Sequence, residues 1–484
     1  MNYKMIGRFV GKILLVEAIF MLPALFISIY KGEDDSVFGF VCSIIVTTLL
    51  GLSLVLGCKN AKKVFYAKEG MVCVAVSWFL ISFAGAFPFY LSGEIPMFVD
   101  ALFETVSGFT TTGASILPEV ESLSMGLIYW RSFTHWLGGM GVLVFVLAIA
   151  NGDKSRGGFA MHLLRAESPG PKVGKLVPKM KNTAEILYGM YIILTLLDFI
   201  FLLLGGMPVF DSLCTAFGTA GTGGFGIKND SMAGYSPYLQ NVCTVFMLLF
   251  GVNFSCYYFI FIGNVKDIFK DEELRLYLGL VTCSILLITS DIYKLYDGVG
   301  EALRHAAFQV SSIITTTGFA TTDFDLWPSF SKMILMLLMI VGACAGSTGG
   351  GFKCGRALLI FKNLKRNIKH SLHSKSVEVI RVNNQVIEEK VLETTNAYLA
   401  AYVFIILASI ILISLDNFSV TTNITAVLAT FNNIGPGFDA VGPTCNFAGF
   451  GVISKLVLIL DMLAGRLEIF TIMVLFLRST WRYK

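Results

Sequence analysis

Charged residues are scarce in this sequence of 484 residues. Asp, Glu, Lys and Arg make up only 14% of it, whereas 55% is hydrophobic and the mean hydropathy is +0.72. A soluble protein carries about 25% charged residues. The shortage excludes a water-soluble globule with a polar coat, and the net charge of +4 is too small to indicate nucleic-acid binding.

Motifs of redox, nucleotide and catalytic chemistry are also missing. The 10 cysteines stand singly, without a C-x-x-C pair, and we interpret them as small hydrophobic residues. The sequence contains no Walker A run and no G-x-G-x-x-G after a strand, so we expect no nucleotide bound by this chain. It shows no H-x-x-x-H spacing and no paired nucleophile and base at membrane depth, and we therefore do not expect an enzyme.

Long apolar runs take the place of these motifs. A helix that crosses a bilayer needs about 20 mostly apolar residues. The first run resembles a signal peptide, but a second run follows at once and no A-x-A cleavage pattern is present, so we expect a retained anchor. We predict about ten spans, near residues 9–30, 37–57, 71–91, 126–150, 184–204, 238–263, 274–292, 331–361, 396–415 and 451–478.

Charge is distributed unequally between the connections. Basic residues gather in 58–70, 151–183 and 362–393, which the positive-inside rule places in the cytoplasm together with both chain ends. The opposite connections hold few basic residues, so we expect an acidic outer vestibule that concentrates cations. Its acidic residues are Glu33, Asp34, Asp35, Glu94, Asp100, Glu104, Glu119, Glu121, Asp211, Asp230, Asp323, Asp325, Asp416 and Asp439.

Four semi-apolar segments are too short to cross. They cover residues 98–110, 208–219, 300–315 and 420–432 on the acidic side, and each runs into a stretch rich in Gly with Thr or Asn. Irregular backbone at membrane depth is tolerated only where protein or a water-filled cavity surrounds it. We therefore predict four re-entrant loops, each made of a short helix and the stretch that follows it.

The four stretches form an internal repeat. They are ETVSGFTTTGAS, TAFGTAGTGGFG, VSSIITTTGFAT and ATFNNIGPGFDA, and we align them on Gly113, Gly223, Gly318 and Gly435. The predicted fold is an all-α membrane protein with four pseudo-symmetric helix–pore loop–helix units around a central pore, after two additional N-terminal transmembrane helices in 1–66. The four pore units cover 67–160, 161–268, 269–390 and 391–484.

Glycine-centred loops that meet at one point suit an alkali cation. Backbone carbonyls can replace the water shell of such an ion, and glycine freely adopts the backbone angles that line carbonyls along one axis. The short helices would turn their partially negative C-terminal ends toward the same point. The alternative is that these Gly and Thr runs only permit tight helix packing.

These loops and units resemble the Trk/Ktr/HKT superfamily of potassium transporters, and the two extra N-terminal spans resemble its TrkH-type membrane subunit. The resemblance implies potassium uptake across the bacterial inner membrane, a homodimer, and a TrkA-like cytosolic regulatory ring that binds nucleotides. We would place that ring on the basic loops 151–183 and 362–393. The resemblance also implies potassium at a selectivity filter made of Thr111, Thr112, Gly113, Gly221, Thr222, Gly223, Thr316, Thr317, Gly318, Asn433, Ile434 and Gly435.

The run 331–361 is too long for one crossing, and its glycines, Ala345 to Gly351, do not remain helical at low cost. We predict a loop inside the membrane, which is either a gate or a passive kink. By resemblance, a gate beneath the filter is formed by Gly346, Ser347, Thr348, Gly349, Gly350, Gly351 and Arg466. The alternative for this arginine is that Asp461 and helix carbonyls of a neighbour satisfy it.

Other polar residues of the spans have open roles. Lys353 either lines the inner pore or does not, while Asp198 and Asn253 are hydrogen-bond partners within the bundle or face water. We expect His135 to be packed at a helix interface and Lys455 to extend outward without a role. The alternative function is a potassium symporter coupled to Na⁺ or H⁺, for which Asp198 and Asp461 are the candidate carboxylates.

Overall fold

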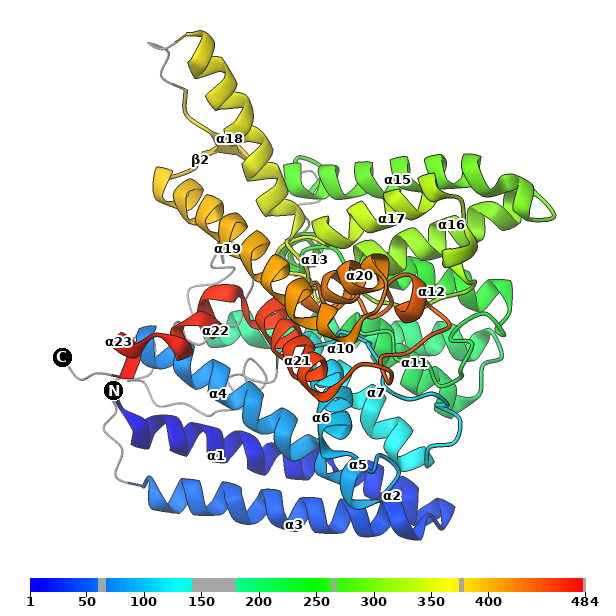
Figure 1. Cartoon of the computed structure of the whole chain (residues 1–484), viewed down its shortest axis with the longest axis vertical. Helices are drawn as coiled ribbons and strands as arrows, with labels where there is room; N and C mark the ends of the chain where they lie inside the picture. Colours follow the sequence, from blue (N-terminus) through cyan, green and yellow to red (C-terminus); the bar gives the residue numbers. More distant parts are fainter. Residues whose placement is uncertain (60–66, 142–179, 262, 264–267, 374–377, 482–484) are drawn as a thin grey trace.

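The protein is built almost entirely of α-helices (Figure 1). The computed structural model describes residues 1–59, 67–141, 180–261, 263, 268–373 and 378–481. The first part of the chain holds α1 (Tyr3–Phe20), α2 (Leu22–Lys31), α3 (Asp34–Gly57), α4 (Ala67–Gly85), α5 (Phe87–Leu91), α6 (Phe98–Phe109) and α7 (Met125–Gly139).

The middle of the chain continues in the same way. It holds α10 (Met180–Leu204), α11 (Val209–Gly221), α12 (Pro237–Phe250), α13 (Phe254–Phe261), α15 (Glu272–Ile292), η1 (Tyr293–Leu295), α16 (Val299–Ile314), η2 (Phe324–Leu326), α17 (Ser329–Val341) and α18 (Cys354–Leu372). The last part begins with a two-stranded antiparallel hairpin. It comprises β1 (Arg381–Val382), β2 (Gln385–Val386), α19 (Glu389–Ile413), η3 (Ser414–Asp416), α20 (Val420–Phe431), η4 (Asp439–Val441), α21 (Val452–Leu467), α22 (Ile469–Phe476) and α23 (Arg478–Trp481).

The N-terminal helices α1 and α3 cross at very short range. A methyl group on Gly11 would lie 2.7 Å from the carbonyl oxygen of Gly51, and one on Gly51 would lie 2.9 Å from that of Gly11. Small residues let helix backbones approach in this way where lipid supplies no hydrophobic drive for association. The opposite side of α3 exposes Leu49 (61%) and Leu56 (66%), as expected for a surface that faces lipid.

The described residues contain six helices that are long and apolar enough to cross a membrane, or seven if α12 and α13 form one bent span. The bend between those two helices is 92°. The predicted span 331–361 is interrupted, as expected from its glycines, between α17 and α18. The predicted span 126–150 contains α7, and its end lies outside the described residues. The count of about ten crossings stays a prediction.

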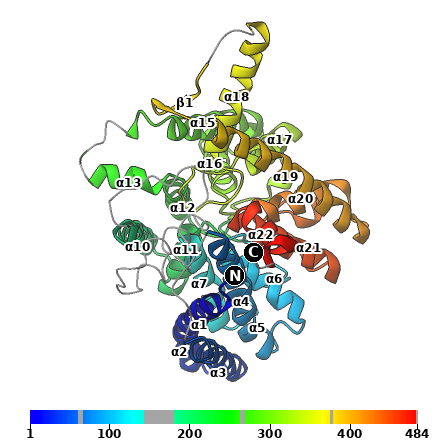
Figure 2. The same cartoon turned by 90° about the vertical axis from the view of Figure 1, so that its left-hand side faces the viewer.

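The four short segments form helices, as predicted: α6, α11, α16 and α20. In both views they lie toward the middle of the molecule, with the longer helices around them (Figures 1 and 2). Helix α18, drawn in yellow, extends beyond the other helices together with the hairpin (Figures 1 and 2). The rings of Tyr3 and Trp481 stack with centroids 6.5 Å apart, so α1 starts where α23 ends.

Candidate functional site

The four short helices end in the same backbone turn. At each end one residue takes a left-handed conformation, with φ between 54° and 59°. The amide of the next residue donates to the carbonyl five positions earlier, at 2.8–2.9 Å, which is a Schellman motif. The left-handed residues are Thr111, Thr222, Thr316 and Asn433, and the donating amides belong to Thr112, Gly223, Thr317 and Ile434.

Three of the left-handed residues are threonines, which is unusual. Glycine or asparagine normally takes this place, because a β-branched residue in the left-handed region costs about 1–3 kcal/mol. The hydroxyls make contacts that glycine lacks. Thr111 Oγ1 accepts from Arg466 Nη1 at 3.2 Å, and Thr316 Oγ1 accepts from the amide of Gly350 at 2.6 Å. The strained residues thus connect the turns to other segments of the chain.

The second loop lies one residue out of the register predicted from the sequence. By hydrogen bonding, Gly223 stands where the first loop has Thr112, and Gly224 stands where it has Gly113. Both Gly113 and Gly224 have positive φ, of 78° and 71°, whereas Gly223 does not. Gly223 is glycine for a different reason: the ring of His135 would lie 2.1 Å from a methyl group on Gly223, so no side chain fits there.

This register differs from the predicted alignment in the second loop. The positions that match Thr111, Thr112 and Gly113 are Thr222, Gly223 and Gly224, and the predicted set does not include Gly224. Gly221 is instead the last residue of α11. In the remaining loops the predicted residues stand in matching places: Thr316, Thr317 and Gly318 in the third, and Asn433, Ile434 and Gly435 in the fourth.

The four loops touch one another in a closed ring, each through the glycine that follows its turn. A methyl group on Gly113 would lie 2.0 Å from the carbonyl oxygen of Gly223, in the second loop. One on Gly224 would lie 1.9 Å from that of Thr317, in the third loop. The contacts continue from Gly318 to the oxygen of Ile434 (2.1 Å), and from Gly435 to that of Thr112 (2.8 Å).

The ring therefore brings together carbonyl groups from the same place in each loop. They belong to residues far apart in the sequence: Thr112, Gly223, Thr317 and Ile434. Each neighbouring glycine leaves no room for a Cβ atom, which explains why that position is glycine in all four loops. Backbone oxygens arranged in rings are the ligands with which proteins replace the water shell of an alkali cation.

The interrupted helix of the third unit places a loop against this ring. Residues 342–353 join α17 to α18 without helical structure. Methyl groups on Gly349 and Gly350 would lie 2.9 Å from the carbonyl oxygen of Thr315 and 2.7 Å from that of Asn432. Thr348 Oγ1 donates to the carbonyl of Phe250, at the end of α12. Residues 342–353, here called the inner loop, thus contact the C-terminal ends of α12, α16 and α20.

Arg466 of α21 contacts this inner loop as well. Its Nη1 donates to the carbonyl of Thr348 at 2.8 Å, and its Nη2 donates to those of Gly138 and Gly139 at 2.5 and 2.6 Å. Helix carbonyls of a neighbour therefore satisfy much of this guanidinium, as the alternative interpretation expected. Asp461, the other predicted partner, accepts a hydrogen bond from Ser409. Arg466 joins the first loop, α7 and the inner loop.

Lys353 and Asn253 belong to the surroundings of the inner loop. Lys353 is buried and has φ of 78°, and its ammonium group donates to the carbonyl of Gly349. Lys353 thus stabilises the inner loop by a hydrogen bond between two of its own residues. A methyl group on Gly346 would lie 3.0 Å from Asn253 Oδ1, which accepts from the amide of Ser255. Asn253 therefore makes a local hydrogen bond at the start of α13, beside the inner loop, and its two predicted roles stay open.

His135 is packed at a helix interface, as predicted. It is buried on α7, and its Nδ1 pairs with the carbonyl of Gly108 on α6 at 2.9 Å. The prediction for Lys455 is wrong. Its side chain is only 6% exposed and donates to Asp100 at 2.6 Å, because the start of α21 packs on α6. Asp198 is fully buried on α10.

The expectation of an acidic outer side without basic partners is wrong in three places. Asp100 pairs with Lys455, Glu104 with Arg131 at 2.6 Å, and Asp325 with Lys332 at 3.3 Å. Two more carboxylates accept hydrogen bonds from backbone amides at the start of α7. Glu33 accepts the amides of Met125 and Gly126, and Glu94 accepts that of Ser124. The charge pattern of the connections does not predict these pairs, because the basic partners lie on the helices α7, α17 and α21 and not in the connections.

Known proteins resemble this chain over its whole length. The family model for TrkH, described as a cation transport protein, matches residues 37–483. The Trk system potassium uptake protein TrkH of Salmonella typhimurium is 34% identical, with all of both chains covered. TrkG of Escherichia coli is 30% identical over 99% of each.

A solved structure shows the same fold. The crystal structure of the potassium transporter TrkH from Vibrio parahaemolyticus superposes with a TM-score of 0.89 over all of both chains, at 29% identity. Its match extends over the short helices and the loops that form the ring. Together with the family model and the relatives, it leaves one assignment: this chain belongs to the TrkH family of cation transport proteins, which are multi-pass membrane transporters and not enzymes.

Proposed function

We propose that this chain is the translocating subunit of a potassium uptake system, through which potassium moves down its electrochemical gradient along a gated, channel-like path. The observation that carries the proposal is the closed ring of matching carbonyl groups from four loops. The names of the similar proteins, which are potassium uptake proteins and a potassium transporter, support the choice of ion.

Potassium would lose its water at the ring. The carbonyl oxygens of Thr112, Gly223, Thr317 and Ile434 would supply one layer of ligands, and potassium is the cargo of this site. The helices α6, α11, α16 and α20 all end at the ring, so their partially negative C-terminal ends favour a cation there. The proposed filter residues are Thr111, Thr112, Gly113, Thr222, Gly223, Gly224, Thr316, Thr317, Gly318, Asn433, Ile434 and Gly435.

The inner loop would be the gate. It sits against the ring through Gly349 and Gly350. The carbonyl of Thr348 accepts a hydrogen bond from Arg466, and the amide of Gly350 donates one to Thr316. A guanidinium group at this place also repels a cation that leaves the ring. Movement of the loop together with Arg466 would therefore open the path, and the predicted gate residues are Gly346, Ser347, Thr348, Gly349, Gly350, Gly351 and Arg466.

A cytosolic partner would control this gate. The proposal is a TrkA-like ring that binds nucleotides and docks on the inner face, where both chain ends and α18 would lie. Helix α18 starts directly after the inner loop and exposes Lys365 and Lys369, so a pull on it would reach the gate. The other predicted docking segment, 151–183, lies almost wholly outside the described residues. The chain would act as a homodimer with about ten crossings per copy.

A symporter coupled to Na⁺ or H⁺ is the second candidate. The observation in its favour is that Asp198 and Asp461 are both buried, at 0% and 3% exposure, and buried carboxylates in membrane segments often move ions. Both functions are tested in liposomes with the purified chain. Under the proposed channel-like function, potassium enters when its own gradient is the only one. Uptake that requires a sodium or proton gradient would establish the symporter instead.

A further inference from the structure

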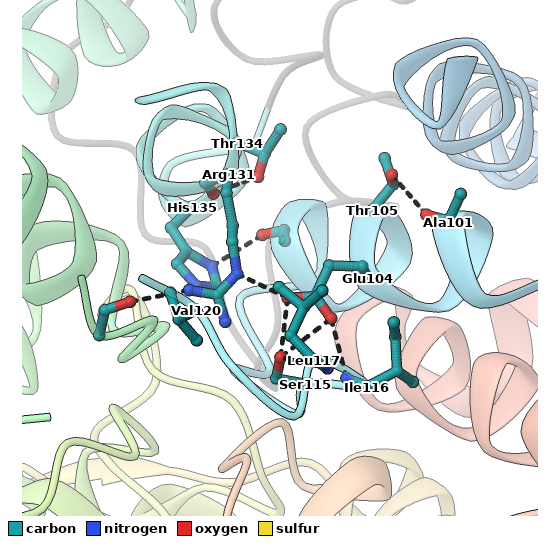
Figure 3. A network of polar contacts seen from close by, with 12 residues as sticks. Ala101, Glu104, Thr105, Ser115, Ile116, Leu117, Val120, Arg131, Thr134 and His135 are labelled. Carbon is teal, nitrogen blue, oxygen red and sulfur yellow. Dashed lines mark hydrogen bonds and ion pairs between the residues drawn. The ribbon is translucent and has the colours of Figure 1, made fainter. Parts of the chain in front are cut away.

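A buried ion pair joins α6 to α7 beside the end of the first loop (Figure 3). Glu104 on α6 and Arg131 on α7 are joined by a hydrogen bond of 2.6 Å from Arg131 Nε to Glu104 Oε1. The two side chains are 0% and 3% exposed. The pair thus stands between the short helix of the first unit and the helix that follows its loop.

Glu104 holds the first loop just after its glycine. Ser115 Oγ donates to both carboxylate oxygens, at 3.0 and 3.2 Å, and the amide of Ile116 donates to Oε2 at 3.0 Å (Figure 3). These residues stand two and three positions after Gly113. The carboxylate therefore fixes the direction in which the backbone leaves the ring.

Arg131 holds the second loop at the matching place. Its Nη1 donates to the carbonyl of Gly226 at 2.8 Å, and its guanidinium carbon lies 3.6 Å from the ring centroid of Phe225. Gly226 stands two positions after Gly224, as Ser115 stands two positions after Gly113. One ion pair thus links equivalent points of two neighbouring loops.

The other junctions between loops are made differently in the described part of the chain. The second and third loops meet through the amide of Met232 and the carbonyl of Ala320, at 2.9 Å. The fourth and first meet through the amide of Phe447 and the carbonyl of Ser115, at 2.8 Å. Asp325, which is partly exposed, accepts the amide of Asp439 between the third and fourth. These contacts involve no buried ion pair.

A buried ion pair is a poor way to gain stability alone. The loss of hydration of both charges roughly cancels their attraction, and apolar residues of similar volume often pack as well. The charged groups instead fix the positions of the groups around them, since a carboxylate or a guanidinium group forms several directional hydrogen bonds at once. Here every bond described runs to a loop of the ring or to the other member of the pair.

We infer that Glu104 and Arg131 are positioning residues that fix the distance between the first and second filter loops, and with it the preference of the ring for potassium over sodium. This inference rests on the proposed function and names two determinants of its selectivity. Neither residue belongs to the proposed filter or gate, and both act through the loop backbones that they hold.

The test compares Glu104→Gln with Asp100→Asn, which removes a carboxylate from a second, partly buried ion pair of α6. Asp100 pairs with Lys455 of α21 and holds no filter loop in the described contacts. Each purified protein is reconstituted, and potassium and sodium uptake are measured separately. We expect the potassium-to-sodium ratio to fall about tenfold in Glu104→Gln, as for other residues that orient ion ligands, and to stay at the wild-type value in Asp100→Asn.

A double variant separates positioning from assembly. Glu104→Gln with Arg131→Met removes both charges, so no unpaired charge remains buried. A monodisperse double variant with a reduced ratio supports the inference, and a wild-type ratio in either assembled variant overturns it. Failure of both variants to assemble, while Asp100→Asn assembles, would show a purely structural role and also overturn it. A wild-type protein that does not prefer potassium contradicts the proposed function itself, which is a distinct outcome.

Discussion

The ring and the inner loop are both rich in glycine, yet they are held in different ways. In the ring, a Cβ atom on Gly113 would meet a backbone oxygen at 2.0 Å, and the equivalent glycines of the other loops meet backbone oxygens in the same manner. In the inner loop, Cβ atoms on Gly349 and Gly350 would also meet backbone oxygens, at 2.9 and 2.7 Å, but one on Gly346 would first meet the side chain of Asn253, at 3.0 Å. The backbone of a neighbouring loop has no room to give, whereas a side chain can turn away.

The contacts that hold the ring and the inner loop in place also differ. Four copies of one helix end support the ring, whereas the inner loop exists once. It is held by backbone hydrogen bonds to residues 250–254 and by the side chains of Arg466, Thr316 and its own Lys353. A repeated backbone cage resists change, because every loop contacts two others. The inner loop has no such repeated partners, and it is therefore better suited to move as a gate.

The largest effect is expected from Gly113→Ala. The added methyl group would displace the carbonyl of Gly223 and break the ring, so potassium uptake into liposomes should fall about a hundredfold, as when ion ligands lose their orientation. Gly93→Ala is the control, since Gly93 has nearly the same φ, 79° against 78°, but open space around it. Wild-type uptake by an assembled Gly113→Ala protein would contradict the closed ring.

Removal of the guanidinium should have the next largest effect, in the opposite direction. Arg466→Ala deletes hydrogen bonds to the inner loop and to α7 together with one positive charge on the path. Without any cytosolic partner, basal potassium uptake should rise about tenfold, the change that 1.4 kcal/mol produces. Arg366→Ala, which removes a more exposed arginine of α18 paired with Glu389, should leave basal uptake unchanged. Equal uptake by Arg466→Ala and wild type would reduce Arg466 to a packing role.

Much of this comparison is visible in the sequence. Apolar runs and the Gly and Thr stretches predict the four short helices, the loops after them and the break at Ala345 to Gly351. These features can be predicted because they depend on apolar periodicity and glycine content within a short stretch of sequence. The structure adds that every loop begins with the same Schellman motif, whose left-handed residue is Thr or Asn and therefore carries no glycine signal.

The register of the second loop and the pair of Lys455 with Asp100 depend on contacts that are distant in sequence. Two adjacent glycines, Gly223 and Gly224, fit the repeat equally well, and Gly223 is glycine because it lies against His135 of another helix. The sequence predicts that Lys455 extends outward. It does not reveal the ion pair with Asp100, because the two residues are 355 positions apart. Single-sequence reasoning has no access to such pairs.

A smaller effect is expected where the ring and the inner loop touch. Thr316→Val keeps the β-branched shape at the strained turn but removes the oxygen that accepts the amide of Gly350. One hydrogen bond is worth about 1 kcal/mol, so basal uptake should rise about fivefold while the potassium-to-sodium ratio stays the same. Thr244→Val is the control, because that hydroxyl bonds only within its own helix among the described contacts. A changed ion ratio in Thr316→Val would mean that the two regions do not act separately.

The smallest effect should come from Gly346→Ala, which makes in the inner loop the same change as Gly113→Ala makes in the ring. With φ of 73° the alanine is strained by about 1 kcal/mol, but the side chain of Asn253 can move aside. We expect a change in basal uptake of about fivefold at most, without any change in ion preference. Gly32→Ala, with φ of 72° and open space, is the matched control. If Gly346→Ala instead altered the preference for potassium, the inner loop would itself be part of the selective path, and a rigid ring above a movable gate would no longer describe this protein.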